Sequence, residues 1–198
     1  MDAMGFPYGV GNNQYGEIGS AVGKISKPFR ILNEPVGGIA TGVSSSLILK
    51  RDGTLWGMGA FEAHSLGYPT EPIKLRDGPI KGFAKGEGTE FIIRPDGSLW
   101  SAGYNADGRL GGGKKVSRSR LEKIIDSGVQ KVVTRQKFTA VIKEDGSLWT
   151  FGTNYQGQLG NGTQLDSSFP VQIESSGVVD ASTYSEQTIY VKSDGSLW

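Results

Sequence analysis

Residues 96–100 read Asp-Gly-Ser-Leu-Trp, and closely similar words begin at Asp52, Asp145 and Asp194. The four words start 44, 49 and 49 residues apart, and they contain all four tryptophans of the chain. A distinctive word that recurs every 40–50 residues or so is typical of a repeat architecture. The sequence therefore predicts a chain built from similar structural units.

A second spaced pattern follows each word. Three residues after Trp100 stands Gly103, and seven residues later Leu110 is followed by Gly111. The same spacing fits the N-terminal residues, where Tyr8 takes the place of Trp. We therefore treat 1–198 as a single repeat domain, with repeats at approximately 4–51, 52–95, 96–144 and 145–193, and with 194–198 beginning a further repeat element.

Short strand-like runs surround each word. In one repeat these are Leu121–Ile125, Val129–Thr134 and Phe138–Ile142, followed by a Leu-Trp strand after the Asp-Gly. Asp-Gly between apolar runs predicts a type I′ hairpin turn, with positive φ at both residues. Ser119–Glu122 also reads as a capping box that opens a short helix. The repeat register favours a strand there, and we follow the register.

Four strands per repeat predict an all-β fold of about sixteen strands: a β-propeller, or a propeller segment, of four four-stranded blades with repeats of about 48 residues. A single blade cannot bury both faces of its sheet. We therefore expect Trp56, Trp100 and Trp149 to be buried between blades, so that Trp→Ala costs about 3–5 kcal/mol. Both ends of the chain lie in the same repeat element. We expect either four blades that close with one end displaced, or a ring completed by more chain or by self-association.

The amino-acid composition argues against several classes of function. The 21 Lys and Arg nearly balance the 20 Asp and Glu, which argues against a nucleic-acid or membrane-surface binder. Without cysteine the chain cannot form disulfides or use a thiolate, and the single histidine, His64, cannot form a histidine-rich metal site. We therefore expect no metal and no cofactor. No apolar run approaches the roughly 20 residues of a membrane helix, and no signal peptide begins the chain. We therefore expect a protein of the cytoplasm, or one carried in a particle.

Candidate chemical motifs favour structural interpretations. Gly111–Lys115 lacks the spacing of a phosphate-binding loop, and the basic residues between Lys114 and Lys123 read as a solvated edge. His64 stands in a loop without a recognisable nucleophile, and the loop carboxylates show no pairing for acid–base work. We expect no catalytic residues and no enzymatic activity.

The words Asp-Gly-Ser-Leu-Trp and Gly-Thr-Asn-Tyr-Gln-Gly-Gln-Leu-Gly-Asn-Gly-Thr, the latter at residues 152–163, resemble the regulator of chromosome condensation repeat family. Tryptophan at this place is common in bacterial and phage members, so we expect a version of that kind. The resemblance implies a β-propeller that presents loops to another macromolecule. Two departures are visible: family rings usually have seven blades, and the frequent Gly-x-x-His-Thr word is missing here.

The loops ten residues upstream of each Asp-Gly differ sharply while the surrounding scaffold repeats. Aromatic and arginine residues on such loops are typical of protein-binding hot spots. We expect a protein partner to contact these loops through Glu87, Arg135, Lys137, Phe138, Tyr184 and Glu186. Phe138 could equally point into its blade. The alternative is the opposite face, around Asn13, Phe61, Tyr104 and Tyr155.

The sequence thus predicts a non-catalytic scaffold that binds a protein, with nucleic acid and membrane excluded as the main partners. Two other functions stay open. One is a structural or adhesin component of a larger assembly, such as a virion or toxin particle. The other is an exchange-factor-like or enzymatic regulator.

Overall fold

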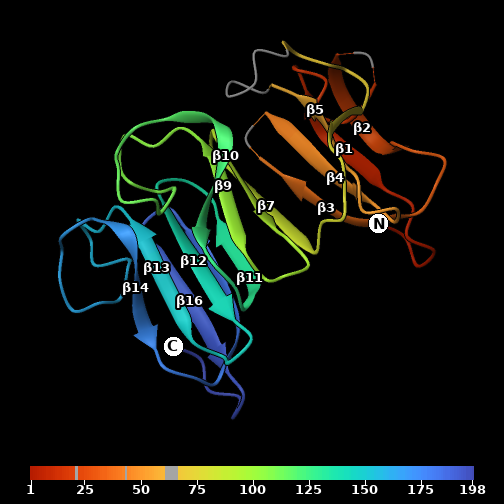
Figure 1. Cartoon of the computed structure of the whole chain (residues 1–198). Helices are drawn as coiled ribbons and strands as arrows, with labels where there is room; N and C mark the ends of the chain where they lie inside the picture. The colour runs from red at the N-terminus through yellow and green to blue at the C-terminus, as the bar shows by residue number, and fades with distance from the viewer. Residues whose placement is uncertain (21, 43, 61–66) are drawn as a thin grey trace. The chain divides into compact units, whose positions relative to one another are not determined.

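The computed structural model of the protein describes residues 1–20, 22–42, 44–60 and 67–198 (Figure 1). These residues form two compact units, Met1–Ile80 and Lys81–Trp198, called unit 1 and unit 2 below. The described residues contain sixteen β-strands and no helix, so the all-β prediction is confirmed. Across this described part of the chain, no helix has the length and apolarity needed to cross a bilayer.

Unit 1 contains one hairpin and one four-stranded sheet. The hairpin pairs β1 with β2, and the sheet is an antiparallel meander in the order β3-β4-β5-β6. The strands are β1 (Tyr8–Asn13), β2 (Gly23–Arg30), β3 (Val36–Thr41), β4 (Ser45–Lys50), β5 (Leu55–Gly59) and β6 (Ile73–Arg76).

Unit 2 contains two four-stranded meanders and one hairpin. The first sheet comprises β7 (Gly82–Gly86), β8 (Thr89–Ile93), β9 (Leu99–Gly103) and β10 (Arg118–Ile125). The second comprises β11 (Val129–Thr134), β12 (Phe138–Lys143), β13 (Leu148–Gly152) and β14 (Ser167–Glu174). The hairpin pairs β15 (Val178–Tyr184) with β16 (Gln187–Lys192).

The sheets follow the repeats of the sequence. Each four-stranded sheet takes two strands from before an Asp-Gly word and two from after it, as β7–β8 and β9–β10 do around Asp96. The β1–β2 hairpin corresponds to the last two strands of such a sheet, and β15–β16 corresponds to the first two. Residues 118–125 form strand β10, so the strand predicted from the repeat spacing is confirmed and the short helix suggested by the capping box is not formed. The assignment of 1–198 to a single domain stays a prediction.

The Asp-Gly turns differ from the predicted type I′ geometry. At the first word the turn closes with Gly53 N–H donating to the Lys50 carbonyl at 3.0 Å, and only the glycine has positive φ, at +84°. Asp52 has a negative φ. Among the described residues, Ser185 is the only non-glycine residue with a positive φ. A turn followed by one left-handed glycine is the three-residue hairpin loop with a glycine bulge.

Trp56, Trp100 and Trp149 are partly and not fully buried, which corrects the prediction, although Trp56 and Trp149 pack against buried hydrophobic clusters. Each is only half-buried, whereas the leucine before it in the word is fully buried. Neighbouring residues of a strand point to opposite faces, so the leucine takes the core position. The indole of Trp100 donates to Ser98 Oγ at 2.8 Å, and the Arg94 guanidinium lies 4.0 Å from its ring centroid.

We therefore expect Leu99→Ala to destabilise the protein by about 2–5 kcal/mol and Trp100→Ala to destabilise it by less. Leu99 is 0% exposed and removing its side chain leaves a cavity, whereas water already reaches part of Trp100. Chemical denaturation of the two variants, followed by circular dichroism, measures the difference. A larger loss for Trp100→Ala would show that tryptophan, not leucine, carries the packing.

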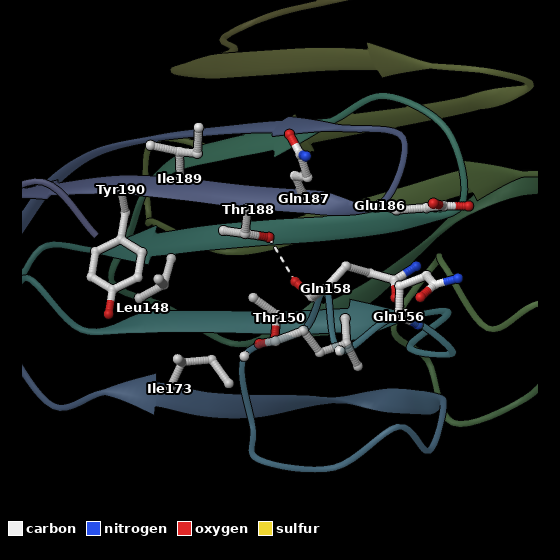
Figure 2. Close-up of a pocket in the computed structure, with 13 residues that line it drawn as sticks. Leu148, Thr150, Gln156, Gln158, Ile173, Glu186, Gln187, Thr188, Ile189 and Tyr190 are labelled. Atoms are coloured by element: carbon white, nitrogen blue, oxygen red, sulfur yellow. Dashed lines mark hydrogen bonds between the residues drawn. The ribbon is translucent and has the colours of Figure 1, made fainter.

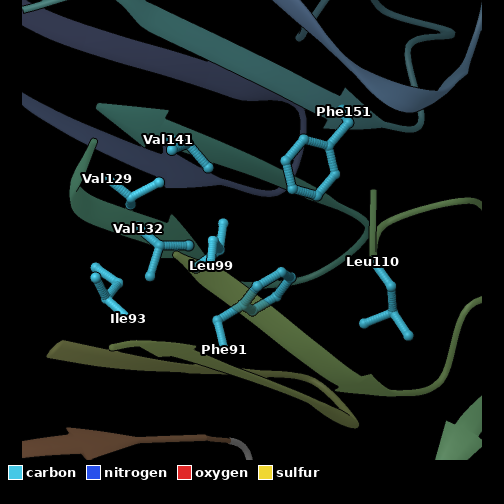
Figure 3. Packing of buried hydrophobic residues seen from close by; sticks show 8 residues of the cluster. All are labelled: Phe91, Ile93, Leu99, Leu110, Val129, Val132, Val141 and Phe151. Atoms are coloured by element: carbon cyan, nitrogen blue, oxygen red, sulfur yellow. The ribbon is translucent and has the colours of Figure 1, made fainter. Parts of the chain in front are cut away.

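The core of unit 2 lies between its stacked strands. Strand β11 packs against β7 and β8, and β15 packs against β11 and β12. Figure 3 shows the larger cluster, in which Phe151 of β13 faces Phe91 of β8 with ring centroids 6.3 Å apart. The other members are Ile93, Leu99, Leu110, Val129, Val132 and Val141. A second cluster joins the β11–β14 sheet to the β15–β16 hairpin.

Candidate protein-binding surface

Two loops of unit 2 are built on buried asparagines. Asn105 is 0% exposed; its Oδ1 accepts the Leu110 N–H at 2.9 Å, and its Nδ2 donates to the Val116 carbonyl at 3.2 Å. Asn154 repeats this arrangement with the Leu159 N–H at 2.9 Å. Buried side-chain amides that satisfy backbone groups hold irregular loops in one conformation. The signal in the sequence was an asparagine two residues after the repeat glycine.

The antiparallel register brings these loops to the same end of the sheets as the variable hairpin loops. Thr89 at the start of β8 pairs with Gly103 at the end of β9. The Tyr104 N–H donates to the Gly88 carbonyl at 2.8 Å, and the Thr153 N–H donates to the Lys137 carbonyl at 3.1 Å. The prediction that Tyr104 and Tyr155 belong to an opposite face is therefore wrong. Within unit 2, the loops of both sets lie at one end of the sheets.

We call this end of unit 2 the loop surface. Its exposed side chains come from both of the predicted faces. They are Glu87, Tyr104, Arg135, Lys137, Tyr155, Tyr184 and Glu186. Three of these are tyrosines, with exposed fractions of 50% for Tyr104, 46% for Tyr155 and 58% for Tyr184.

Arg109 joins three of the loops from beneath the surface. Its side chain is 5% exposed and forms an ion pair with Asp107. Its Nη1 donates to the carbonyls of Glu87, at 3.2 Å, and of Gln136. The Tyr104 ring centroid lies 5.2 Å from the guanidinium carbon. A planar fork of donors suits this task, because one guanidinium can bond several acceptors at fixed angles.

Sequence reasoning missed Arg109. In two of the other repeats the equivalent positions hold Glu17 and Gln158, and each of these residues bonds a backbone N–H of its own loop instead, at Tyr15 and Gln156. The available signal was a charged residue directly before the buried Leu110-Gly111 of the repeat pattern.

The β15–β16 hairpin adds the remaining part of the loop surface. The Arg135 guanidinium lies 4.9 Å from the ring centroid of Tyr184, and the Tyr155 hydroxyl donates to Glu186 Oε1 at 2.6 Å. Ser185, between Tyr184 and Glu186, has a φ of +45°, a conformation that is uncommon for residues other than glycine. These contacts connect charged and aromatic side chains from loops far apart in the sequence.

Two of the predicted contact residues are buried, and a third lies outside the described residues. Phe138 is 1% exposed at the start of β12, so of its two predicted positions the structure shows the core position, and it is not available to a partner. Asn13, in unit 1, is 0% exposed, and its Oδ1 accepts the Ile18 N–H at 2.7 Å. Phe61 lies outside the described residues, as does His64.

Several charged residues of unit 2 form ion pairs with neighbouring side chains. Lys115 pairs with Asp166 at 3.0 Å, and Lys123 pairs with Asp126 at 2.8 Å. Asp180 pairs with Lys131, so this carboxylate and Asp107 both sit beside a cation and not beside a second acid. Within the described ranges, no group of three histidine or acidic side chains could hold a metal ion.

Glu186 raises the pKa of Tyr155, chiefly through their hydrogen bond, because ionisation would place a phenolate beside a carboxylate. We expect Glu186→Gln to lower the pKa of Tyr155 toward the ordinary value of about 10. Glu87→Gln, on the same surface, should leave it unchanged. A pH titration of the Tyr155 ring signals by NMR measures the pKa. An unchanged value in Glu186→Gln would show that this hydrogen bond does not form in solution.

Comparison with known families decides the identity of one segment. Residues 145–187, from the third Asp-Gly word through β15, match the family model of the Regulator of chromosome condensation (RCC1) repeat. The segment is an RCC1 repeat. It contains Asn154, Tyr155, Tyr184 and Glu186, so part of the loop surface lies within this repeat.

Solved structures of RCC1-like proteins share the fold. Human WBSCR16 superposes with a TM-score of 0.83 at 21% identity, over 96% of this chain and 54% of its own. Yeast RCC1 (Prp20) bound to Kap60 gives 0.77 at 15%, over 89% and 46%. Prp20p from Saccharomyces cerevisiae, described with its binding properties to Gsp1p and histones, gives 0.74 at 16%, over 94% and 49%. These likenesses show a fold of the β-propeller type.

The chain spans about half the length of the solved structures that it matches. No curated relative matches the sequence. The bacterial or phage-like version of the repeat stays a prediction.

Proposed function

We propose that the chain is a non-catalytic scaffold that binds a protein partner through the loop surface of unit 2. The observation that carries this proposal is a set of three exposed tyrosines, of which Tyr104 and Tyr155 lie on loops fixed by buried Asn105 and Asn154. Buried Arg109 also connects the Tyr104 loop to two neighbouring loops. Tyrosine and arginine provide a large share of protein-binding energy. Loops that are already ordered lose little conformational entropy on binding.

The charges of the loop surface favour a protein over a polyanion. Arg135 and Lys137 lie on one hairpin, whereas Glu87 and Glu186 lie on two others. A nucleic acid would require mainly basic residues and would bind with a steep dependence on salt. A mixed surface suits a partner of complementary mixed charge. Yeast RCC1 (Prp20), which shares the fold, is seen bound to the protein Kap60, and this supports a role in protein binding.

The other functions predicted from the sequence stay predictions. A structural component of a larger assembly would depend on the shape of the fold and not on particular loop residues. An exchange-factor-like regulator would use the same loop surface to contact its target, so it differs in the consequence of binding and not in the binding itself.

Affinity purification from cells that produce the protein tests the proposal. We expect a protein partner whose affinity falls at least about tenfold in Arg135→Glu and Glu186→Arg, with unchanged melting temperatures. Asp126→Lys is the matched control, because Asp126 is exposed at the far end of the same unit, next to the Asp-Gly turns. If both loop variants bind normally while Asp126→Lys does not, the partner uses the other end of the sheets.

A further inference from the structure

Residues 161–163 read Asn-Gly-Thr, and Asn161 is the only asparagine of the chain that is followed by glycine. A glycine in this position has no Cβ to keep its backbone nitrogen away from the asparagine side chain. Asn161 is half-buried, whereas Gly162 is exposed. A Cβ added at Gly162 would lie more than 4 Å from the non-neighbouring residues that the structure describes. Water therefore reaches the peptide bond between Asn161 and Gly162.

The backbone that leads to Asn161 is held in place by two strands of unit 2. The Thr188 hydroxyl of β16 donates to the Gln158 carbonyl at 2.8 Å, the hydrogen bond that Figure 2 draws as a dashed line. The Thr150 hydroxyl of β13 donates to the Leu159 carbonyl, also at 2.8 Å. The backbone is therefore fixed two residues before Asn161, so the surroundings of this side chain are built by the fold.

Three donors converge on the side-chain carbonyl of Asn161. Its Oδ1 accepts from the Thr163 N–H at 3.0 Å, from the Thr163 hydroxyl at 2.9 Å and from Asn154 Nδ2 at 3.0 Å. Donors aimed at a carbonyl oxygen stabilise the negative charge that forms on it when a nucleophile adds to the carbon. The nitrogen of Gly162 is the adjacent nucleophile, and its N–H has no backbone acceptor among the described residues. The arrangement therefore favours attack on Asn161 Cγ.

The Asp-Gly words of the repeats have a similar set of donors but lack the reactive groups. Asp96 Oδ1 accepts from the Ser98 N–H at 2.9 Å and from the Ser98 hydroxyl at 2.6 Å. The hydrogen bonds from the Ser98 hydroxyl and N–H hold the pKa of Asp96 below its ordinary value, so the carboxylate stays ionised and resists attack. The Gly97 N–H also donates to the Arg94 carbonyl at 2.9 Å. Asn161 differs in both respects, because its amide is neutral and the N–H of the glycine after it does not close a turn.

We propose that Asn161 is a self-modification site, at which the loop converts its own asparagine to isoaspartate and aspartate. The Gly162 nitrogen loses its proton to hydroxide and forms a bond to Asn161 Cγ. The bond from Cγ to Nδ2 then breaks, and Nδ2 takes a proton from water and leaves as ammonia. Water opens the resulting cyclic imide at either of its two carbonyls, which gives isoaspartate or aspartate. The reaction needs only water and no partner, so this proposal does not rest on the proposed function.

The modification changes the loop that carries Tyr155. Isoaspartate adds a methylene group to the main chain, and both products replace a neutral amide with a negative charge. Asn154 Nδ2 closes this loop by donating to the carbonyls of Thr163, at 2.9 Å, and Leu165, at 3.1 Å, as well as to Asn161. A longer main chain at Asn161 moves these acceptors relative to the buried amide, so the loop loses part of the support that fixes it.

Mass spectrometry of the full chain during incubation at neutral pH tests the proposal. Exchange of ammonia for water changes the mass of the fragment that contains Asn161, and electron-transfer fragmentation distinguishes isoaspartate from aspartate. The reference is the blocked peptide Leu-Gly-Asn-Gly-Thr-Gln, which copies residues 159–164. We expect Asn161 to convert at least as fast in the folded chain as in the peptide, which lacks the Asn154 donor. Slower conversion in the folded chain, or isoaspartate at Asp96 at the same rate, would overturn the proposal.

Substitutions of Thr163 test the contribution of the donors. Thr163→Val removes the hydroxyl donor at similar size and should slow the conversion of Asn161 several-fold, whereas Thr163→Ser keeps a hydroxyl and should not. Thr163 is exposed, so both variants are expected to fold. If Thr163→Val fails to fold, the comparison of the unchanged chain with the peptide still decides. Equal conversion rates in the two folded variants would show that the hydroxyl does not assist the reaction, and the proposed role of the donors would be wrong.

Discussion

Replacement of Phe151 by alanine is expected to lower the free energy of unfolding by about 3–5 kcal/mol. Phe151 is 0% exposed and lies between two sheets of unit 2, against Phe91 and on Gly111. Truncation removes a large apolar side chain and leaves a cavity, because the strands on both sides are fixed by their own hydrogen bonds.

Chemical denaturation followed by circular dichroism measures this loss. Phe169→Ala is the matched control, because Phe169 is 63% exposed on β14 and its truncation should change stability by less than about 0.5 kcal/mol. If the two variants were equally stable, the packing of Phe151 between the sheets would be wrong.

Replacement of Arg109 by methionine is expected to cost about 3–5 kcal/mol, the range for removing one member of a buried ion pair. Methionine keeps much of the apolar stem but leaves the mostly buried Asp107 carboxylate without its partner. It also removes the donor to the Glu87 and Gln136 carbonyls. Arg109→Lys should recover only part of the loss, because an ammonium cannot reproduce the planar fork.

Arg120→Met is the control for this substitution, because Arg120 is exposed on the edge strand β10. Hydrogen exchange adds a readout specific to the loops: the Glu87 amide, which donates to the Arg135 carbonyl at 2.7 Å, should exchange faster in Arg109→Met. Unchanged exchange at Glu87 would mean that Arg109 does not hold the two loops together.

The strand pattern could be predicted from the sequence because turns were marked at each repeat. The Asp-Gly words and the spaced glycines fix where the chain reverses, and β11 and β12 lie within one residue of the predicted runs. The burial of Trp100 could not be predicted in the same way. Leu99 and Trp100 are adjacent and both apolar, and repeat spacing does not say which of two alternating faces is covered.

The loop surface was only partly predictable. Its variable residues Arg135, Tyr184 and Glu186 stand out against a repeating scaffold, and the structure places them together. The assignment of Tyr104 and Tyr155 to another face ignored strand direction, because in a meander the first and third connections lie at the same end. The buried position of Arg109 depends on loops more than 20 residues away, so it required the structure.

The central claim is that the loop surface of unit 2 contacts a protein partner, and site-directed photo-cross-linking tests it most directly. A photoreactive amino acid at Tyr155 or Tyr184 should give a discrete protein adduct in cells that produce the chain, and Arg135→Glu should weaken that adduct. The same group at Asp126, at the opposite end of the sheets, should give none. An adduct at Asp126 with none at Tyr155 or Tyr184 would contradict the account.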